Sequence, residues 1–554
     1  MKNAIIVSGN KFSFFLLFMD FSDLLEALQN PEIYPEKPPK VELLQTHVSA
    51  IFLVGERVYK VKKPVNFGFL DFTTLEKRKY FCREEVALNR RLCPEVYLGV
   101  VEIRLQNGRI SLGEGSGEII EYSVLMKRLP QESMMDRRLA EGRVTPADLQ
   151  KIAAKVAHFH RQAEAGPEIV PFGKIEVIRT NVEENFSQAE RYVGIAFSLE
   201  AFREIRDHTR DFLDKNLPLF ERRITAGKIR DCHGDLHLQH ICLGDEILIF
   251  DCIEFNPRFR YGDVAADIAF LLMDLDFHGH PGFSAELAAA YLSFSGDWPL
   301  YLLLNFYKTY RACVRGKVFG FRLDDPAISF PEKTAAQEVA RRYFLLARQY
   351  AEKMNRPSLI LTCGLMGTGK STIARVLSDA LGWKRLSSDM VRKELAGLSP
   401  AERRYEPFQQ GIYASDFSEK TYRALFAQAG ELLQAGSSVI LDASFHRERE
   451  RAAALDLATK MRADFLMIEC RCEDVIIRQR LDARLRKENE PSDGRWEIFQ
   501  EQKKIFERIQ GWNPDLYLSL DTRLPLEECL QKIFRHLLKR EGRAFEKEKK
   551  EVGR

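Results

Sequence analysis

The sequence predicts a multidomain protein in which an α+β region is followed by an α/β region. The chain has 554 residues, which is more than one hydrophobic core usually serves. Its first part has a few β-type runs around one helical stretch and then becomes mainly helical, whereas residues 358–540 alternate short β-type runs with helical stretches. The content of 45% hydrophobic and 29% charged residues excludes disordered and collagen-like chains.

The charge balance and the cysteines predict a cytoplasmic protein. Lys and Arg total 83 against 80 Asp and Glu, a net charge of +3, which argues against a nucleic-acid-coating protein. The ten cysteines contain no CxxC pair, as is typical of a reducing compartment. The apolar run at 12–19 is far shorter than the roughly 20 residues that span a bilayer. We therefore expect no membrane segment, and we interpret this run as a short extension.

The elements expected along the chain define six regions. Residues 1–40 hold the extension and a helix at 20–30, and residues 41–130 hold β-type runs at 50–55, 57–63, 97–105 and 117–129 with a helix at about 74–92. Residues 131–350 are mainly helical, with Thr145 and Asp148 capping one helix. Residues 351–357 form a linker, 358–540 the α/β region, and 541–554 a charged tail expected to be solvated.

The strongest motif is a phosphate-binding loop that matches G-x-x-x-x-G-K-S in full. It follows the β-type run 358–363 and opens a helical stretch, the context that this motif requires. Backbone N–H groups would surround the phosphates, Lys370 would reach the β- and γ-phosphates, and Ser371 would bind Mg²⁺. The expected nucleotide-binding residues are Gly364, Leu365, Met366, Gly367, Thr368, Gly369, Lys370, Ser371 and Thr372.

Further residues of the α/β region narrow its class. Asp389 with Arg392 follows the second β-type run, and Asp442 ends the third, where a carboxylate acts on Mg²⁺ or its water. Arg480 and Arg484 are one helical turn apart and either close over phosphates or form a solvated face. The region resembles small P-loop kinases of the gluconate kinase, polynucleotide kinase and zeta-toxin type. That resemblance implies that Asp389 is the general base.

A second motif lies in the first half of the chain. His233-Gly234-Asp235 and, after a short hairpin, Asp251 resemble the catalytic and metal-binding segments of aminoglycoside phosphotransferases, which share the protein-kinase plan. The resemblance implies that Asp235 accepts a proton from the acceptor hydroxyl and that Asp251 holds Mg²⁺. It also implies a lysine that reaches the nucleotide phosphates and pairs with a glutamate of the next helix, for which Lys60 and Glu85 are the candidates. Lys62 and Glu84 are their alternatives.

One residue departs from this pattern. His240 stands where these kinases place a second Mg²⁺ ligand, normally asparagine, so metal preference and turnover are open. A zinc site of His233, His237, His240 and Cys242 is an alternative that fits no common spacing. The resemblance further implies that Asp267 braces the catalytic loop. Glu254 and Asp263 are candidates for substrate contacts.

The whole order resembles bacterial proteins that fuse an aminoglycoside phosphotransferase to an ATP-binding kinase. The resemblance implies a protein-kinase-like bilobal fold followed by a P-loop NTPase domain with a parallel sheet. It also implies ATP and Mg²⁺ as cofactors and a small hydroxylated molecule as acceptor. A nucleic-acid partner is not expected, and the acceptor's identity and the oligomeric state remain open. The alternatives are a nucleotide-gated regulator with a pseudokinase half and a nucleic-acid 5′-end kinase.

Overall fold

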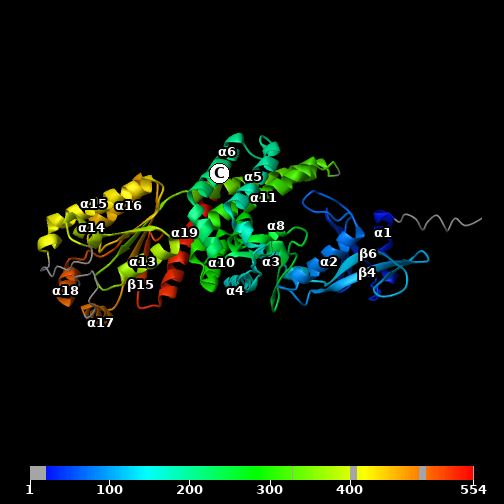
Figure 1. Cartoon of the computed structure of the whole chain (residues 1–554), viewed down its shortest axis with the longest axis horizontal. Coiled ribbons are helices and arrows are strands. Elements are labelled where there is room, and N and C mark those ends of the chain that lie inside the picture. Colours follow the sequence, from blue (N-terminus) through cyan, green and yellow to red (C-terminus); the bar gives the residue numbers. More distant parts are fainter. Residues whose placement is uncertain (1–19, 327, 400–408, 486–494, 553–554) are drawn as a thin grey trace, which may run out of the picture. The chain divides into compact units, whose positions relative to one another are not determined.

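The computed structural model describes residues 20–326, 328–399, 409–485 and 495–552 (Figure 1). These residues divide into two units. The first runs up to Ile178 and includes Pro218–Asp274, and the second comprises Arg179–Leu217 and Leu275–Arg554. The predicted extension at 1–19 lies outside the described residues.

An antiparallel sheet forms the β-rich part of the first unit. Its strand order is β1-β2-β3-β6-β4-β5. The bounds are β1 Glu42–Gln45, β2 Ser49–Val54, β3 Arg57–Lys62, β4 Tyr97–Gln106, β5 Arg109–Leu112 and β6 Glu118–Lys127. Helix α1 (Phe21–Ala27) precedes the sheet, and α2 (Leu75–Asn89) packs on β6 and β4 (Figure 1). On β2, Ala50, Phe52 and Val54 are fully buried, because alternate side chains of a strand point to one face.

The rest of the first unit positions two loops. Its helices are α3 Met135–Ala140, α4 Pro146–Gln162, α7 Leu217–Thr225, α8 Pro257–Arg260 and α9 Val264–Phe277, and its strands are β7 Ile229–Asp231, β8 Ile241–Leu243, β9 Ile247–Ile249 and β10 Tyr261–Asp263. The predicted cap of α4 is present, because the Asp148 N–H donates to Thr145 Oγ1 over 3.2 Å. The β8–β9 hairpin separates the loop that carries Asp235 from the loop that carries Asp251, as the spacing of the motifs predicts.

Long helices open the second unit. They are α5 Ile175–Ala189 (which begins in the first unit), α6 Leu199–Lys215, α10 Pro281–Ser295, α11 Leu304–Asp324 and α12 Phe330–Met354, with a 3₁₀ segment, η6, at Trp298–Leu303. Helix α12 packs against α11 and α6, and the rings of Phe277 and Tyr343 stack with centroids 3.8 Å apart. Among the described residues, no helix combines the length and the apolar character needed to cross a bilayer.

A parallel five-stranded sheet forms the α/β region, with strand order β12-β13-β11-β14-β15. The strands are β11 Ser358–Cys363, β12 Lys384–Ser387, β13 Val439–Asp442, β14 Asp464–Arg471 and β15 Tyr517–Asp521, which lie at the five predicted positions. The helices between them are α13 Lys370–Leu381, α14 Ser388–Leu395, α15 Ser415–Gln434, α16 Glu448–Lys460, α17 Asp474–Leu485 and α18 Trp496–Ile505. Because β11 and β13 are parallel neighbours, the phosphate-binding loop and Asp442 meet at one sheet edge.

The final helix corrects the prediction of a solvated tail from residue 541. Helix α19 spans Leu526–Val552 and packs along α10 (Figure 1). Phe545 is buried and stacks with Tyr350 at a centroid distance of 5.6 Å, and Tyr301 donates a hydrogen bond to Glu541. The sequence of this segment conceals the contact, because its apolar residues are too few to show a helical period.

Candidate functional site

Three elements of the first unit bring a lysine and two carboxylates together. Lys60 of β3 lies 2.9 Å from Glu85 of α2, and its ammonium donates to Asp251, after β9, over 2.7 Å. Burial alone would lower the pKa of Lys60, but the carboxylates of Asp251 and Glu85 outweigh it and raise this pKa well above its usual range. The predicted lysine–glutamate pair is therefore formed, and it lies directly beside the predicted metal-binding aspartate.

Lys62, the alternative lysine, is buried away from solvent and belongs to a second ion pair. Its ammonium lies 2.7 Å from Glu85 and also contacts Glu254. Glu254 is 9% exposed, so it is not placed for the substrate contact suggested from the sequence. Asp263 is likewise buried and accepts two hydrogen bonds from Arg223, at 2.8 and 2.7 Å. Both carboxylates thus have structural partners instead of an open site.

The catalytic-loop candidate Asp235 is held in place by Asp267 of α9. The Asp267 carboxylate accepts the backbone N–H groups of His233 at 3.0 Å and Gly234 at 2.8 Å, which is the predicted bracing. Gly234 has a φ of +85°, and a Cβ there would lie 2.8 Å from the carbonyl oxygen of Phe259. The Asp235 side chain is 33% exposed, so an acceptor hydroxyl has access to it.

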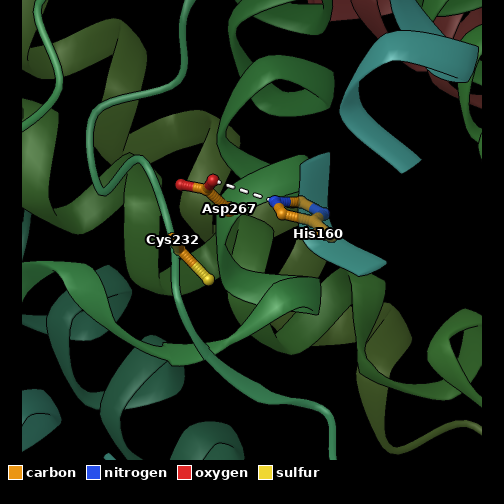
Figure 2. A group of neighbouring side chains, drawn as sticks. All are labelled: His160, Cys232 and Asp267. Atoms are coloured by element: carbon orange, nitrogen blue, oxygen red, sulfur yellow. Dashed lines mark hydrogen bonds and ion pairs between the residues drawn. The ribbon is translucent and has the colours of Figure 1, made fainter. Parts of the chain in front are cut away.

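His160 of α4 completes this brace, a contact that the sequence does not reveal. Its Nε2 lies 3.1 Å from Asp267, and Figure 2 shows the imidazole directed at the carboxylate. The thiol of Cys232 is close enough to make a three-residue group with them. However, Asp267 already accepts hydrogen bonds from the backbone N–H groups of His233 and Gly234, so the arrangement is a hydrogen-bond network that orders the loop.

His240 lies between Asp235 and Asp251, the two aspartates singled out from the sequence. Its Nδ1 is 2.9 Å from the carbonyl oxygen of Asp235, and its Nε2 is 3.4 Å from Asp251 Oδ2. Burial and the neighbouring His237 lower the pKa of His240 to about 4, so the ring is neutral at pH 7. Since a carbonyl only accepts, Nδ1 carries the proton and the Nε2 lone pair faces the carboxylate. Two lone pairs facing one space fit a bound cation, so Asp251 and His240 suit a divalent metal.

The alternative zinc set does not form. In the described part of the chain, the metal-ligand group that contains His237 and His240 is completed by Asp235, and it includes neither His233 nor Cys242. The Nε2 of His233 is instead 3.0 Å from the carbonyl oxygen of Phe250. Within the residues that the structure describes, His237 and His240 therefore group with Asp235 and do not make a tetrahedral Cys–His site with His233 and Cys242.

The phosphate-binding loop has the expected strand–loop–helix form between β11 and α13. Gly364 has a φ of +129°, and a Cβ there would lie 2.5 Å from the carbonyl oxygen of Cys470, so only glycine fits. The Lys370 ammonium donates to the carbonyl of Leu365 over 2.8 Å, inside the loop. Burial lowers the pKa of Lys370, although Asp442 and Asp389 act in the opposite direction. An anionic ligand in this loop would therefore stabilise the charged lysine.

Oxygen ligands for a metal stand beside this loop. Ser371 Oγ lies 3.2 Å from Asp442 Oδ1, and both residues fit Mg²⁺, which prefers hard oxygen ligands. Arg385 of β12 lies 3.4 Å from Asp442 Oδ2 and was not predicted, because its strand gives no motif. Burial raises the pKa of Asp442, and Lys370 partly offsets this effect.

The remaining predicted residues lie around the loop. Asp389 of α14 pairs with Arg392 at 3.1 Å. Arg480 of α17 donates to the carbonyl of Thr522 at 2.7 Å, and the Thr522 hydroxyl donates to the carbonyl of Thr368 at 2.6 Å. Arg480 thus lies next to the phosphate-binding loop as expected. The side chain of Arg484 lies outside the described residues.

Gln502 of α18 also contacts the phosphate-binding loop, and no motif in the sequence predicts this contact. Its side-chain carbonyl accepts the backbone N–H of Met366 over 2.8 Å. The two residues are 136 positions apart in the sequence, so only the fold brings them together.

Comparisons with known proteins match both parts of the chain. A family model described as a phosphotransferase enzyme family matches residues 81–304, and one described as an AAA domain matches residues 359–509. These matches support a phosphotransferase. The uncharacterized proteins Rv2004c of Mycobacterium tuberculosis and Mb2027c of Mycobacterium bovis are each 31% identical over 447 residues, covering 80% of this chain and 86% of theirs.

Solved kinase structures are similar to each part. A gluconokinase from Sinorhizobium meliloti is 18% identical and covers 34% of this chain and 95% of its own, with a TM-score of 0.25. A choline/ethanolamine kinase family protein from Mesorhizobium loti is 12% identical and covers 58% of this chain and 97% of its own, with a TM-score of 0.34.

Proposed function

The chain belongs to the family of the mycobacterial proteins Rv2004c and Mb2027c, and on this premise we propose that it is an ATP- and Mg²⁺-dependent phosphotransferase with two nucleotide sites. Each site would transfer a phosphoryl group to a hydroxyl of a small molecule. The observation that carries the proposal is the meeting of Lys60, Glu85 and Asp251 from three separate elements, in the first unit.

In the first site, the chain's own residues would perform three tasks. Lys60, oriented by Glu85, would bind nucleotide phosphates once it turns from Asp251. Asp235, held by the brace from Asp267, would accept the proton of the acceptor hydroxyl. Asp251 and His240 would hold the metal, which neutralises charge on the phosphates when bound. Catalysis would then rest mainly on positioning and electrostatic stabilisation.

In the second site, the loop of residues 364–372 would bind the phosphates through backbone N–H groups, with Lys370 as the cation. Ser371 and Asp442 would hold Mg²⁺, and Asp389 would orient or deprotonate the acceptor. The position of Asp389 supports this role. Its charge raises the pKa of both Lys370 and Asp442, so Asp389 lies close to the two residues. The acceptor could differ between the two sites.

The test is a screen of the full-length protein with labelled ATP and a pool of small metabolites. We expect transfer of label to at least one hydroxylated metabolite. Asp235→Asn should abolish transfer at the first site, and Lys370→Ala should abolish transfer at the second site. Label on oligonucleotide ends would instead indicate a 5′-end kinase. ATP hydrolysis without any labelled metabolite, unchanged by Asp235→Asn, would contradict the proposal for the first site and indicate a regulator.

We also place the protein in the cytoplasm. All ten cysteines are unpaired, and nine of them are buried, which supports a reducing compartment.

A further inference from the structure

The second lysine of β3 is part of the first site's architecture, although it does not reach the site's open side. Lys62 is 1% exposed and Glu85 is fully buried, whereas the side chain of Asp251 is 40% exposed. Glu85 is shared, since Oε1 lies 2.9 Å from Lys60 and Oε2 lies 2.7 Å from Lys62. Lys62 also contacts Glu254.

These contacts form a continuous chain of opposite charges. Its order is Asp251, Lys60, Glu85, Lys62 and Glu254. The two ends, Asp251 and Glu254, are three residues apart on the segment after β9, so the ion pairs close into a ring through the backbone. The ring fastens this segment to β3 at two points and to α2 through Glu85.

The balance of charges in the ring explains what the second lysine, Lys62, contributes. The ring holds three carboxylates and two ammonium groups, all in or near the protein interior. When Lys60 turns toward the phosphates of a nucleotide, Asp251 and Glu85 lose a partner. If Lys62 were absent, Glu85 and Glu254 would then be buried carboxylates without a countercharge, which is strongly unfavourable. With Lys62 present, both keep one.

We propose that Lys62 and Glu254 are positioning residues of the first nucleotide site, which hold Glu85 and the metal-binding segment in place while Lys60 binds phosphate. This inference rests on the proposed function and adds to it a second ion pair. Asp251 also has a φ of +62°, a conformation that non-glycine residues adopt only with support from their surroundings. The Glu254 contact supplies such support three residues away.

The experiment measures nucleotide binding by the full-length protein. Lys370→Ala serves as the parent, so that binding reports the first site. Isothermal titration with AMP-PNP, with and without Mg²⁺, is then repeated for Glu254→Gln, Lys62→Met, the double variant and Glu254→Asp. We expect each neutralising single variant to weaken Mg²⁺-dependent binding on the order of tenfold and to raise the Mg²⁺ concentration needed. The double variant should weaken binding about as much as Lys62→Met alone, because both leave Glu85 without a countercharge when Lys60 turns to the phosphates. Glu254→Asp should retain most of the affinity.

A matched control separates positioning from stability. Glu121 of β6 pairs with Arg78 of α2 at 2.8 Å, and this pair is also buried in the same sheet–helix layer. Glu121→Gln should lower the Tm as much as Glu254→Gln does but leave nucleotide affinity unchanged. If Glu254→Gln and the double variant behave like this control, with affinity and Mg²⁺ dependence within twofold of the parent, the positioning role is wrong. Failure of the parent itself to bind Mg²⁺ and nucleotide would instead overturn the proposed function, and the positioning role with it.

Discussion

At the scale of single residues, His240 is the proposed metal ligand that would influence which cation the first site binds. A neutral imidazole is a softer ligand than the amide oxygen normally found at this position of the kinase plan, and Mg²⁺ favours oxygen. The ring is fixed by its hydrogen bond to the carbonyl of Asp235, which leaves Nε2 directed toward Asp251. The side chain is therefore held in place by a protein contact, and as a metal ligand its imidazole nitrogen would suit Mg²⁺ less well than an amide oxygen does.

We predict that His240→Asn shifts the metal preference of the first site. The wild-type protein should bind nucleotide better with Mn²⁺ than with Mg²⁺, and the variant should change this ratio several-fold toward Mg²⁺. Titration calorimetry with AMP-PNP and either metal, in the Lys370→Ala background, measures the ratio. His158→Asn, at an exposed position of α4, is the control and should leave it unchanged. An identical ratio in the wild type and His240→Asn would show that His240 does not contact the metal.

A second histidine, His446, leads to a prediction about how stability depends on pH. Burial, assisted by Arg447, lowers the pKa of His446 from 6.5 to about 4, so the folded state holds this ring neutral. Above pH 6.5 both folded and unfolded states are neutral there, and stability is unaffected. As the pH falls from 6.5 toward 4, the unfolded chain takes up a proton that the folded chain resists, and stability is lost. His446→Gln should lose less Tm over this window, measured by thermal melts between pH 7 and 4.5. Parallel curves for the two proteins would contradict the assignment.

At the scale of elements, the sequence predicts those helices and strands that are determined by residues close to one another in the chain. The five strands of the α/β region and the cap of α4 lie where predicted, because apolar runs and capping residues act within a few positions of themselves. The edge strands β1 and β5 were not predicted, since they do not alternate with helical stretches, the pattern that revealed the equally short β12 and β13. Helix α19 beyond residue 540 was not predicted, because its contacts are remote in sequence: Tyr301 of η6 lies 240 residues before its partner Glu541. Likewise, the pair of Lys60 and Glu85 was predicted from the kinase-like motifs. The contacts of Lys62 with Glu254 and of His160 with Asp267 were not, because they join residues that are far apart in the sequence.

We predict that the α19 face is essential to the stability of the second unit. Phe534 of α19 is fully buried and stacks on Trp298 of η6 with centroids 5.1 Å apart. Phe534→Ala should lower the free energy of unfolding by about 3–5 kcal/mol, as other large buried truncations do. Denaturant unfolding measures the change. Phe330→Ala, at a side chain that is 83% exposed, should have almost no effect, and an equal effect of the two would show that the α19 packing contributes little.

At the scale of the whole molecule, the sequence motifs and the structural units divide the chain differently. The motifs suggest a boundary near 351–357, and the units assign α10, α11 and α12 to the same body as the P-loop domain. Helix α13, which begins in the phosphate-binding loop, contacts η6 within this body. Within the second unit, the helices α10–α12 and the P-loop domain are thus joined by packing as well as by the chain.

We predict that the two halves do not fold well apart. Fragments of residues 20–357 and 358–554 would each expose one side of the α10–α19 interface, including Trp298 or Phe534. Each fragment alone should be poorly soluble, and co-expression should restore a soluble complex that co-purifies. Size-exclusion chromatography after co-expression is the measurement. Two stable, non-interacting fragments would show that the interface is dispensable.

The late position of α19 in the sequence also affects how the protein folds during its synthesis. A ribosome releases α10 and η6 more than 200 residues before it completes the helix that covers them. Until then, the apolar surface around Trp298 has no native cover, and such surface is prone to aggregation or chaperone binding during synthesis. A premature stop just before Leu526 would spare every nucleotide-binding motif described above and still leave the second unit without α19.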